Sequence, residues 1–273
     1  MKEGYADFLL VRAVEDLEER LAAVLRPFPL ALDVGTPTPL ASEALKRSGR
    51  VDKVVRLSPL PEPDAIHGDE ERLPFSGEQF DLAISLLALQ GVNDLPGTLI
   101  QIRRALKADG LFIGALLGGS TLTELRQAMT QAESELEGGV SPRVAPFADL
   151  RDIGGLLQRA GFALPVTDTD IVRVRYANAF ALMRDLRRMG LTNALNDRRR
   201  TPLKRATLFR AAEIYAERFG DPDGRIPATF EIVWLSGWTP HESQQKPLKP
   251  GSAQMRLADA LGAKNGAGHP EEE

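Results

Sequence analysis

The chain has 273 residues and no cysteine, which excludes disulfides, thiolate metal sites and cysteine nucleophiles. Its formal net charge of −4 argues against a general nucleic-acid binder, and no apolar run reaches membrane-spanning length. The start of the chain lacks the apolar stretch of a signal peptide, and the three histidines lie far apart in sequence. We therefore expect a cytoplasmic protein with no membrane insertion, no nucleic-acid partner and no metal site.

Helices and strands alternate over the first 119 residues. Apolar side chains at helical spacing predict an amphipathic helix at 6–26, and short apolar or β-branched runs predict strands. The elements expected after that helix are, in chain order, strand 30–34, helix 42–47, strands 53–57, 65–68 and 80–87, helix 94–106, a turn at 107–110 and strand 111–117. Asp94 is expected to cap its helix, with Pro96 in the first turn. This alternation predicts a mainly parallel, doubly wound α/β sheet.

The second half of the chain continues the pattern with longer elements. The elements expected there are helices 122–137 and 147–160, strand 166–176, helices 179–189 and 202–219, and strand 228–238. Trp234 and Trp238 lie four residues apart in the last strand, so they should share a face and pack in the core. The basic residues at 187–188, 198–200 and 204–205 suit a solvated helix face, or a surface that receives an acidic partner.

The turn after the first strand is the segment most informative about function. The strand that ends at Val34 runs into Gly35, with the acid Asp33 just before it, as in a nucleotide-binding α/β domain. Pro37 and Pro39 then stand where further glycines would follow. Proline donates no N–H and has a fixed φ, whereas glycine permits positive φ and close approach of the backbone to a ligand. The loop therefore lacks part of what cradles a nucleotide.

Motifs over nearly the whole chain resemble those of one family. The matching segments are 28–35, 73–75, 80–81, 92–96, 112–115, 118–119, 159–162, 189–190, 192–193 and 237–244. They resemble the respiratory complex I assembly factor (arginine hydroxylase) family of the class I S-adenosylmethionine (SAM) methyltransferase superfamily. That family is related to the malonyl-carrier-protein methyltransferase of biotin synthesis. The resemblance implies a class I methyltransferase-like (Rossmann-like) fold with a helical insertion and a C-terminal extension.

The resemblance also implies how the chain is divided. The expected parts are an N-terminal amphipathic helix (1–27), a methyltransferase-like nucleotide-binding core (28–119), substrate-side helices and C-terminal strands completing the same domain (120–261), and a disordered acidic tail (262–273). Ligands of open α/β sheets bind outside the carboxyl ends of the strands. We therefore expect a partner surface there, roofed by residues 138–146 and 238–249. Its substrate- or partner-binding residues would be His241, Glu242 and Gln244.

A SAM site is implied at the carboxyl ends of the first four strands. The candidate cofactor-binding residues are Asp33, Gly35, Ser58, Asp69, Glu70 and Leu87. The chain departs from the family pattern in the two prolines, in Ser58 where an acid would take the ribose hydroxyls, and in Leu-Gln-Gly at 89–91 in place of Leu-His-Trp. Asp69, with Glu70, matches the acid on the adenine side. Each lost charge-assisted hydrogen bond costs about 1.5–3 kcal/mol, so we expect SAM to bind with a Kd above about 100 μM.

Three functions fit the sequence. The leading one is a methyltransferase-fold assembly factor that acts on a protein client, such as a subunit of respiratory complex I. The second is an active SAM-dependent methyltransferase on a small or carrier-bound substrate, and the third is a pseudoenzyme that kept the fold as a binding module. The sequence names no catalytic base. A SAM titration separates the second function from the third, and capture of respiratory subunits favours the first.

Overall fold

A computed structural model describes residues 6–147, 149–194 and 198–244. The chain up to Pro240 forms one compact unit, and His241 begins a second. The helices are α1 (Phe8–Ala22), α2 (Leu40–Arg47), the short 3₁₀ helix η1 (Leu89–Gly91), α3 (Leu95–Ala105), α4 (Thr123–Glu137), α5 (Leu150–Arg159), α6 (Ala179–Arg188) and α7 (Arg205–Phe219). The strands are β1 (Phe28–Val34), β2 (Val51–Ser58), β3 (Ala65–His67), β4 (Phe80–Leu86), β5 (Leu106–Leu117), β6 (Ala163–Tyr176) and β7 (Ile226–Trp238).

Seven strands form one sheet in the order β3-β2-β1-β4-β5-β7-β6. Strands β1 to β5 run parallel, whereas β7 pairs antiparallel with both β5 and β6. The central strand β4 is buried along its whole length, as expected for a strand covered on both faces. The arrangement confirms the predicted fold class, a doubly wound and mainly parallel α/β sheet.

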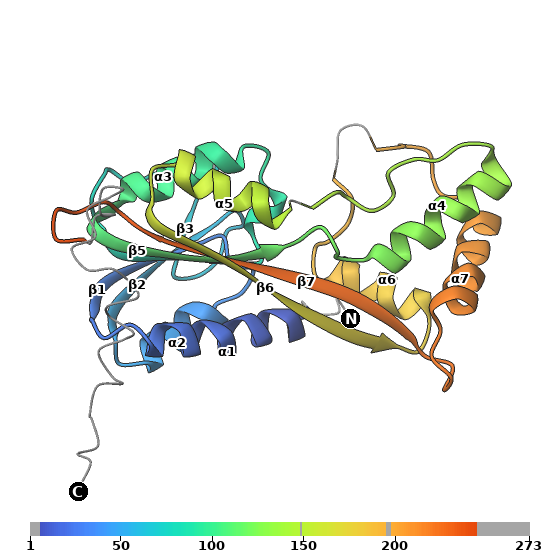
Figure 1. Cartoon of the computed structure of the whole chain (residues 1–273), viewed down its shortest axis with the longest axis horizontal. Helices are drawn as coiled ribbons and strands as arrows, with labels where there is room; N and C mark the ends of the chain where they lie inside the picture. The colour runs from blue at the N-terminus through green and yellow to red at the C-terminus, as the bar shows by residue number, and fades with distance from the viewer. Residues whose placement is uncertain (1–5, 148, 195–197, 245–273) are drawn as a thin grey trace, which may run out of the picture. The chain divides into compact units, whose positions relative to one another are not determined.

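Helices cover both faces of the sheet, with α1 and α2 on one side and α3 and α5 on the other (Figure 1). The stripe that α1 buries includes Leu10 and Leu17, which are fully buried. On the other face, Phe112 stacks on Phe162 with ring centroids 5.5 Å apart. Trp234 is buried in the same hydrophobic cluster as Leu10 and Leu17, and Trp238 packs against that cluster. This confirms the prediction that both tryptophans pack in the core.

The helical lobe, made of α4, α6 and α7, lies beyond the end of β5 (Figure 1). There β6 and β7 continue past Leu117, the last paired residue of β5, as a two-stranded ribbon in which residues 171–176 pair with 226–231. The buried Tyr215 of α7 donates its hydroxyl to the carbonyl of Pro227, 2.8 Å away. This bond ties the lobe to the ribbon.

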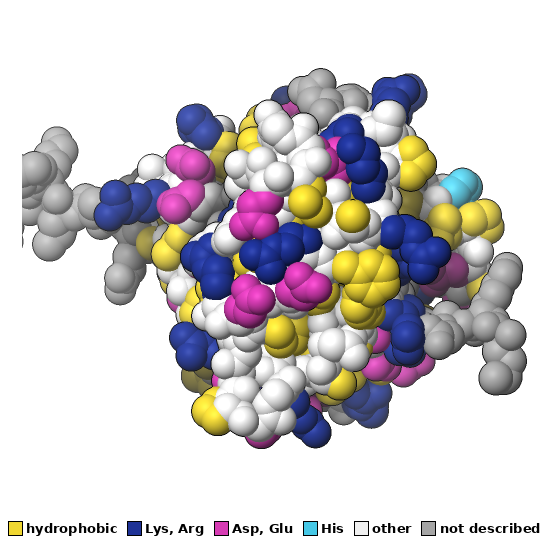
Figure 2. Space-filling model, turned by 90° about the vertical axis from the view of Figure 1, so that its right-hand side faces the viewer, with side chains coloured by type: hydrophobic (Ala, Val, Ile, Leu, Met, Phe, Trp, Pro, Cys, Tyr) yellow, Lys and Arg dark blue, Asp and Glu magenta, His cyan; other side chains and the backbone are white. Residues whose placement is uncertain are grey.

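The basic residues of the lobe are interspersed with acidic ones. Figure 2 views the molecule from this end and shows Lys and Arg side chains next to Asp and Glu, without a continuous basic surface. Arg199 lies 2.5 Å and Lys204 3.9 Å from the carboxylate of Glu137 on α4. These contacts agree with the prediction of a solvated face.

Two local predictions have different outcomes. Asp94 caps α3 as predicted, accepting a hydrogen bond of 2.8 Å from the amide of Gly97. The turn predicted at 107–110 is instead part of β5, which pairs with β4 through a register shift. Asp109 has a φ of 59° there, and Arg26 holds its carboxylate at 2.6 Å. The Asp109–Gly110 pair has turn composition, so the sequence does not distinguish a strand irregularity from a turn.

The direction of β7 corrects another prediction. Trp238 pairs with Leu111 near the start of β5, and Thr239 donates from its amide to the carbonyl of Gly110 at 2.8 Å. The end of β7 therefore lies at the amino ends of the parallel strands, because an antiparallel strand delivers its end to the opposite edge. The expectation that a segment starting at Trp238 roofs the carboxyl ends is wrong for Trp238 and Thr239.

The described helices include none that is both long and apolar enough to cross a bilayer. Residues 245–261 and the predicted acidic tail at 262–273 lie outside the described residues. The division at residue 261 therefore stays a prediction.

Candidate functional site

The cofactor edge is the set of loops at the carboxyl ends of β1 to β4. Because these strands are parallel, their ends meet at one edge, and Gly35, Ser58, Glu70 and Leu87 lie on it. Gly35 has a φ of +71°, a conformation that favours glycine, and its amide donates to the carbonyl of Leu57 at 2.9 Å. The topology thus brings together the ends at which the cofactor-binding residues were predicted.

Glu70 covers the glycine of this edge. A Cβ atom added at Gly35 would lie 2.3 Å from Oε1 of Glu70, so the carboxylate rests directly against the glycine backbone. Burial, and then the neighbouring charges of Asp69 and Glu71, raise the pKa of Glu70, although its own backbone opposes this rise. A larger residue at position 35 would expel this side chain, so the glycine serves a contact within the chain.

Arg56 links the loops after β1 and β2. It pairs in register with Asp33, and its Nε lies 3.5 Å from the Asp33 carboxylate. Its two terminal nitrogens donate to the carbonyl of Thr36 at 2.9 Å and to the carboxylate of Glu62 at 2.7 Å. Sequence reasoning missed both Arg56 and Glu62 as site residues. The available signal was an arginine within a run of buried strand residues, a position that requires nearby acceptors.

Asp33 is fully buried, and neither of its carboxylate oxygens has a hydrogen-bond partner among the described residues. Burial raises the pKa of Asp33 to about 7, and the neighbouring Thr36 and Arg56 offset only part of that rise. The group therefore titrates near neutral pH inside the folded protein.

Ser58 contacts a carboxylate from farther along the chain, that of Glu62. The predicted ribose-binding position holds a buried serine, whose hydroxyl donates to Glu62 at 3.1 Å. The chain returns over four residues, so a carboxylate lies beside position 58 although position 58 itself carries none. That carboxylate is also the partner of Arg56, and its charge is therefore already balanced.

Asp69 is exposed and accepts a hydrogen bond of 2.8 Å from the amide of Glu71. The side chain of Glu71 in turn accepts from the amides of Asn93 and Asp94. These bonds fix the segment after β3 against the start of α3. The structure thus gives Asp69 a turn-capping contact, and its predicted contact with an adenine stays a prediction.

Leu87 follows β4 with a φ of 52° and donates from its amide to the carbonyl of Ala115 at 2.8 Å. The side-chain nitrogen Nε2 of Gln90 donates to the Leu87 carbonyl at 2.7 Å. The buried side-chain oxygen Oε1 of Gln90 has no hydrogen-bond partner among the described residues. Leu87 is itself buried, so it shapes the edge through its backbone more than through its side chain.

A cavity of about 510 Å³ lies next to the end of β5, between α4 and the roof loop, which comprises residues 138–147. Its lining includes Gly119, Arg126, Met129, Arg143, Val144 and Phe147. The loop predicted at 138–146 borders a cavity on the carboxyl side of the sheet, and its role as the roof of a partner surface stays a prediction. Neither Gly35 nor Ser58 lines this cavity.

Glu133 of α4 anchors the roof loop. Its carboxylate is fully buried and accepts from the amide of Ser141 at 2.7 Å, the Ser141 hydroxyl at 2.9 Å and Nε of Arg143 at 2.6 Å. Burial raises the pKa of Glu133, but the hydrogen bonds from Ser141 and Arg143 outweigh it, so the pKa lies below its usual value. A charged Glu133 therefore fixes the loop over α4.

Known proteins resemble the chain in sequence over most of its length. Residues 32–114 match the family model described as a methyltransferase domain. The chain is 42% identical over 264 residues to "Arginine-hydroxylase NDUFAF5, mitochondrial" of Danio rerio, with 93% of this chain and 82% of that protein covered. The human protein of that name is 40% identical over 271 residues, with 93% and 76% covered.

The chain belongs to the NDUFAF5 arginine-hydroxylase family. This confirms the resemblance drawn from the sequence motifs. The "Malonyl-[acyl-carrier protein] O-methyltransferase" of Xylella fastidiosa is a further relative, 34% identical over 248 residues with 85% of this chain and 79% of that protein covered.

Solved structures agree with the fold of this NDUFAF5-family chain. The YcgJ protein of Bacillus subtilis superposes with a TM-score of 0.57 at 14% identity, covering 84% of this chain and 99% of that one. A putative methyltransferase of Bacillus halodurans gives a TM-score of 0.56 at 16% identity, with 83% and 98% covered. At these identities the likeness shows the fold alone.

The residues at the cofactor edge of this NDUFAF5-family chain contact one another. A SAM molecule approaching Gly35 would have to displace Glu70, and it would compete with Arg56 for Glu62. Pro37 and Pro39 offer no amide donors in the loop. Weak binding of SAM at this edge stays a prediction. Groups of three or more His, Cys, Asp or Glu side chains that could hold a metal ion are absent from the described part of the chain.

The partner-binding residues predicted after β7 form a locally bonded turn. Nδ1 of His241 lies 2.7 Å from the Ser243 hydroxyl and accepts from the Ser243 amide, and the Gln244 amide donates to the His241 carbonyl at 3.2 Å. His241 and Glu242 are exposed. The turn begins the second unit of this NDUFAF5-family chain, and the partner role of His241, Glu242 and Gln244 stays a prediction.

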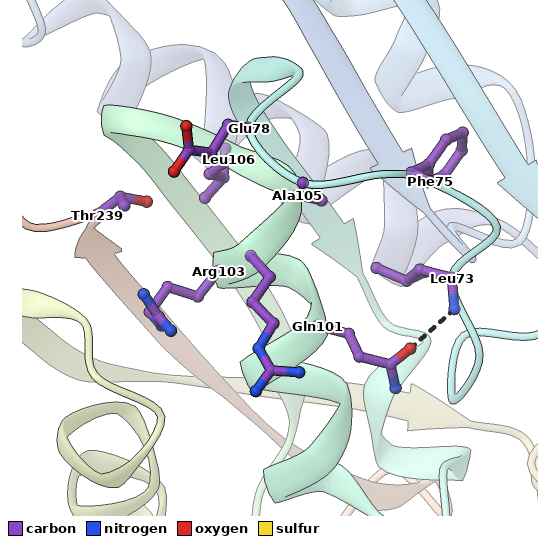
Figure 3. Close-up of a pocket in the computed structure, with 10 residues that line it drawn as sticks. Leu73, Phe75, Glu78, Gln101, Arg103, Ala105, Leu106 and Thr239 are labelled. Atoms are coloured by element: carbon purple, nitrogen blue, oxygen red, sulfur yellow. Dashed lines mark hydrogen bonds between the residues drawn. The ribbon is translucent and has the colours of Figure 1, made fainter.

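Another cavity, of about 590 Å³, lies at the amino ends of β4 and β5 (Figure 3). Arg103 and Thr239 lie on one side of it and Leu73 and Phe75 on the other, and Gln101 accepts from the Leu73 amide at 3.0 Å. Because the strands of the NDUFAF5-family core are parallel, this cavity is at the edge opposite to Gly35. It is therefore separate from the cofactor edge.

Proposed function

We propose that this NDUFAF5-family chain is an assembly factor that acts on a protein client, a subunit of respiratory complex I, and that it does so without tight SAM binding. Family membership supports the protein client, because the relatives are named as arginine hydroxylases. The observation that carries the second part is the contact of Glu70 with Gly35. The proposed site of action is the cytoplasm.

A second candidate is an active SAM-dependent methyltransferase on a carrier-bound substrate. The malonyl-carrier-protein methyltransferases among the relatives support it. The carboxylate of Glu62 beside Ser58 also favours it, since an acid at the end of the second strand suits a ribose. A pseudoenzyme that binds without catalysis differs from both in giving neither SAM binding nor a modified client.

Calorimetric titration with SAM is expected to give a Kd above about 100 μM, or about −5.5 kcal/mol of binding free energy. The physical reason is that Glu70 already occupies the space over Gly35 and the two prolines donate no hydrogen bond. Glu70→Ala should then tighten binding by about threefold or more, because it frees the glycine backbone without removing a donor.

Asp52→Ala serves as the matched control for this titration, since Asp52 is exposed and lies at the start of β2, at the opposite edge. It should leave the affinity unchanged. A low-micromolar isotherm for the parent protein would instead contradict the proposal of weak SAM binding and favour the second candidate.

His241→Ala combined with Gln244→Ala is expected to reduce capture of isolated complex I subunits severalfold. Residue 241 is exposed and this segment is the most specific sequence match to the family, so contact with a partner explains it better than packing. Exposed substitutions change stability by about 0.5 kcal/mol at most, so the melting temperature should stay within about 2 °C of the parent.

Gln158→Ala, on the exposed side of α5, is the control for client capture and should behave as the parent. Unchanged capture by the double variant, or a collapse of its melting temperature, would assign the segment to structure. Absence of capture by the parent protein would reject the assembly-factor proposal.

A further inference from the structure

The cavity at the amino ends of β4 and β5 lies apart from the edge that the proposed function uses. Its volume of about 590 Å³ falls within the range of small-molecule sites, roughly 300–1,000 Å³. Leu73 and Phe75 line one side of it, whereas Glu78, Arg103 and Thr239 lie on the other (Figure 3). The cavity therefore combines an apolar wall with a charged one.

Hydrogen bonds to the backbone fix the frame of this cavity. The amide of Glu78 donates to the carbonyl of Arg104 at 2.9 Å, which ties the segment before β4 to the end of α3. The side chain of Gln101 accepts from the amide of Leu73 at 3.0 Å and donates to the carbonyl of Glu71 at 2.5 Å. The apolar wall and the segment that carries Glu78 are therefore both held on α3.

Charges of both signs line the cavity, and they do not pair with one another. Arg103 and Arg104 belong to the last turn of α3, and neither forms an ion pair or a side-chain hydrogen bond with any described residue. The Nε of Arg103 is a buried donor without a partner, next to the turn at Gly161. The carboxylate of Glu78 also has no partner within the described part of the chain. The cavity therefore offers two guanidinium groups and one carboxylate that are free to bind a ligand.

We propose that this cavity binds a free α-amino acid with an apolar side chain, in its zwitterionic form. Arg103 and Arg104 hold the carboxylate, because guanidinium groups bind carboxylates through paired N–H donors of fixed geometry. Glu78 accepts from the ammonium group, and the side chain packs on Leu73 and Phe75. A ligand with only a negative charge is repelled by the carboxylate, and a ligand with only a positive charge is repelled by the two guanidinium groups. This amino acid is distinct from the substrate or client of the proposed function.

Phenylalanine is the probe for the test, with the intact chain at constant ionic strength and binding measured by calorimetry. The parent protein should bind it saturably. Phenylalanine amide lacks the carboxylate and should bind at least tenfold more weakly, the loss expected for a hydrogen bond between charged groups. N-acetyl-phenylalanine lacks the ammonium charge and should bind at least threefold more weakly, a smaller loss because its partner is exposed. Glycine should also bind more weakly, since it leaves the apolar wall uncovered.

Two variants test the two ends of the ligand separately. Arg104→Gln should weaken phenylalanine at least threefold without weakening phenylalanine amide, because the amide has no carboxylate for the arginine to bind. Glu78→Gln should weaken phenylalanine and tighten N-acetyl-phenylalanine, because it removes a negative charge beside an anionic ligand. Both residues are exposed, so we expect both variants to fold.

Arg205→Gln on α7 and Glu15→Gln on α1 are the matched controls. Each removes the same charge from an exposed helix position that does not line the cavity, so neither should change the affinity for phenylalanine. Saturating phenylalanine should also raise the melting temperature of the parent and of both controls, because it binds the folded state. Equal losses in Arg104→Gln and Arg205→Gln would overturn the inference. So would N-acetyl-phenylalanine binding as tightly as phenylalanine to the parent protein, or failure of the parent protein to bind phenylalanine.

Discussion

Glu133→Ala is expected to lower the free energy of unfolding by about 3–5 kcal/mol, the range for removing one partner of a buried ion pair. The variant leaves Arg143 largely buried without its carboxylate and frees Ser141, so the roof loop loses its attachment to α4. Because the pKa of Glu133 lies below its usual 4.5, its stabilisation is present above pH 4.5 and is lost as the pH falls through the lowered pKa. The loss should therefore be largest at neutral pH and should shrink in acid.

Urea unfolding at pH 7 measures this effect, with Glu135→Ala as the matched control. Glu135 is on the same helix and pairs with Arg210 at 2.7 Å, but both groups are partly exposed. Ion pairs of that kind contribute about 0–1 kcal/mol. If the two variants were equally stable, Glu133 would not anchor the loop.

Asp33→Asn is expected to stabilise the protein by more at pH 8 than at pH 5. The folded state raises the pKa of Asp33 from 3.8 to about 7, so the native protein holds this proton more tightly than the unfolded chain does. Stability therefore falls as the pH rises from about 4 to about 7, by at most ~4 kcal/mol. Asparagine is always neutral and removes that loss, while Arg56 keeps Glu62 and Thr36 as partners.

The measurement is the melting temperature of Asp33→Asn relative to the parent at the two pH values. A gain of several degrees is expected at pH 8 and a smaller one at pH 5, since about 1 kcal/mol moves the midpoint by about 2–4 °C in a protein of this size. The exposed Asp52→Asn on β2 should show no such pH-dependent difference. A gain of the same size at pH 5 would mean that Asp33 is charged throughout.

The sequence predicted the order of elements because each carries its own periodicity. The strand at 80–87 and the cap at Asp94 are local features, and both are present in the structure. The direction of β7 was not accessible in this way. Its apolar pattern is the same for either direction, and only the connection through the helical lobe decides which end meets Leu111.

The cofactor edge was predictable in position but not in its contacts. Parallel strands bring Gly35, Ser58 and Glu70 to one edge whatever their side chains do. The pairing of Arg56 with Glu62 depends on a return of the chain through a proline-rich loop, and long side chains reach across such loops in ways that spacing does not reveal. The sequence also did not indicate that Glu133 is buried, since its position in an amphipathic helix is that of an ordinary charged residue.

The sheet is held more firmly at the cofactor edge than in the two-stranded ribbon. Around the cofactor edge β2, β1 and β4 each have a strand on both sides, so their twist is fixed by their neighbours. Past Leu117 only residues 171–176 and 226–231 continue, and a pair of strands twists more than a wide sheet does. The ribbon next to the helical lobe can therefore bend more easily than the wide sheet. Bending of the ribbon would change the opening of the cavity beside α4, while the glycine turn at residue 35 would stay in place.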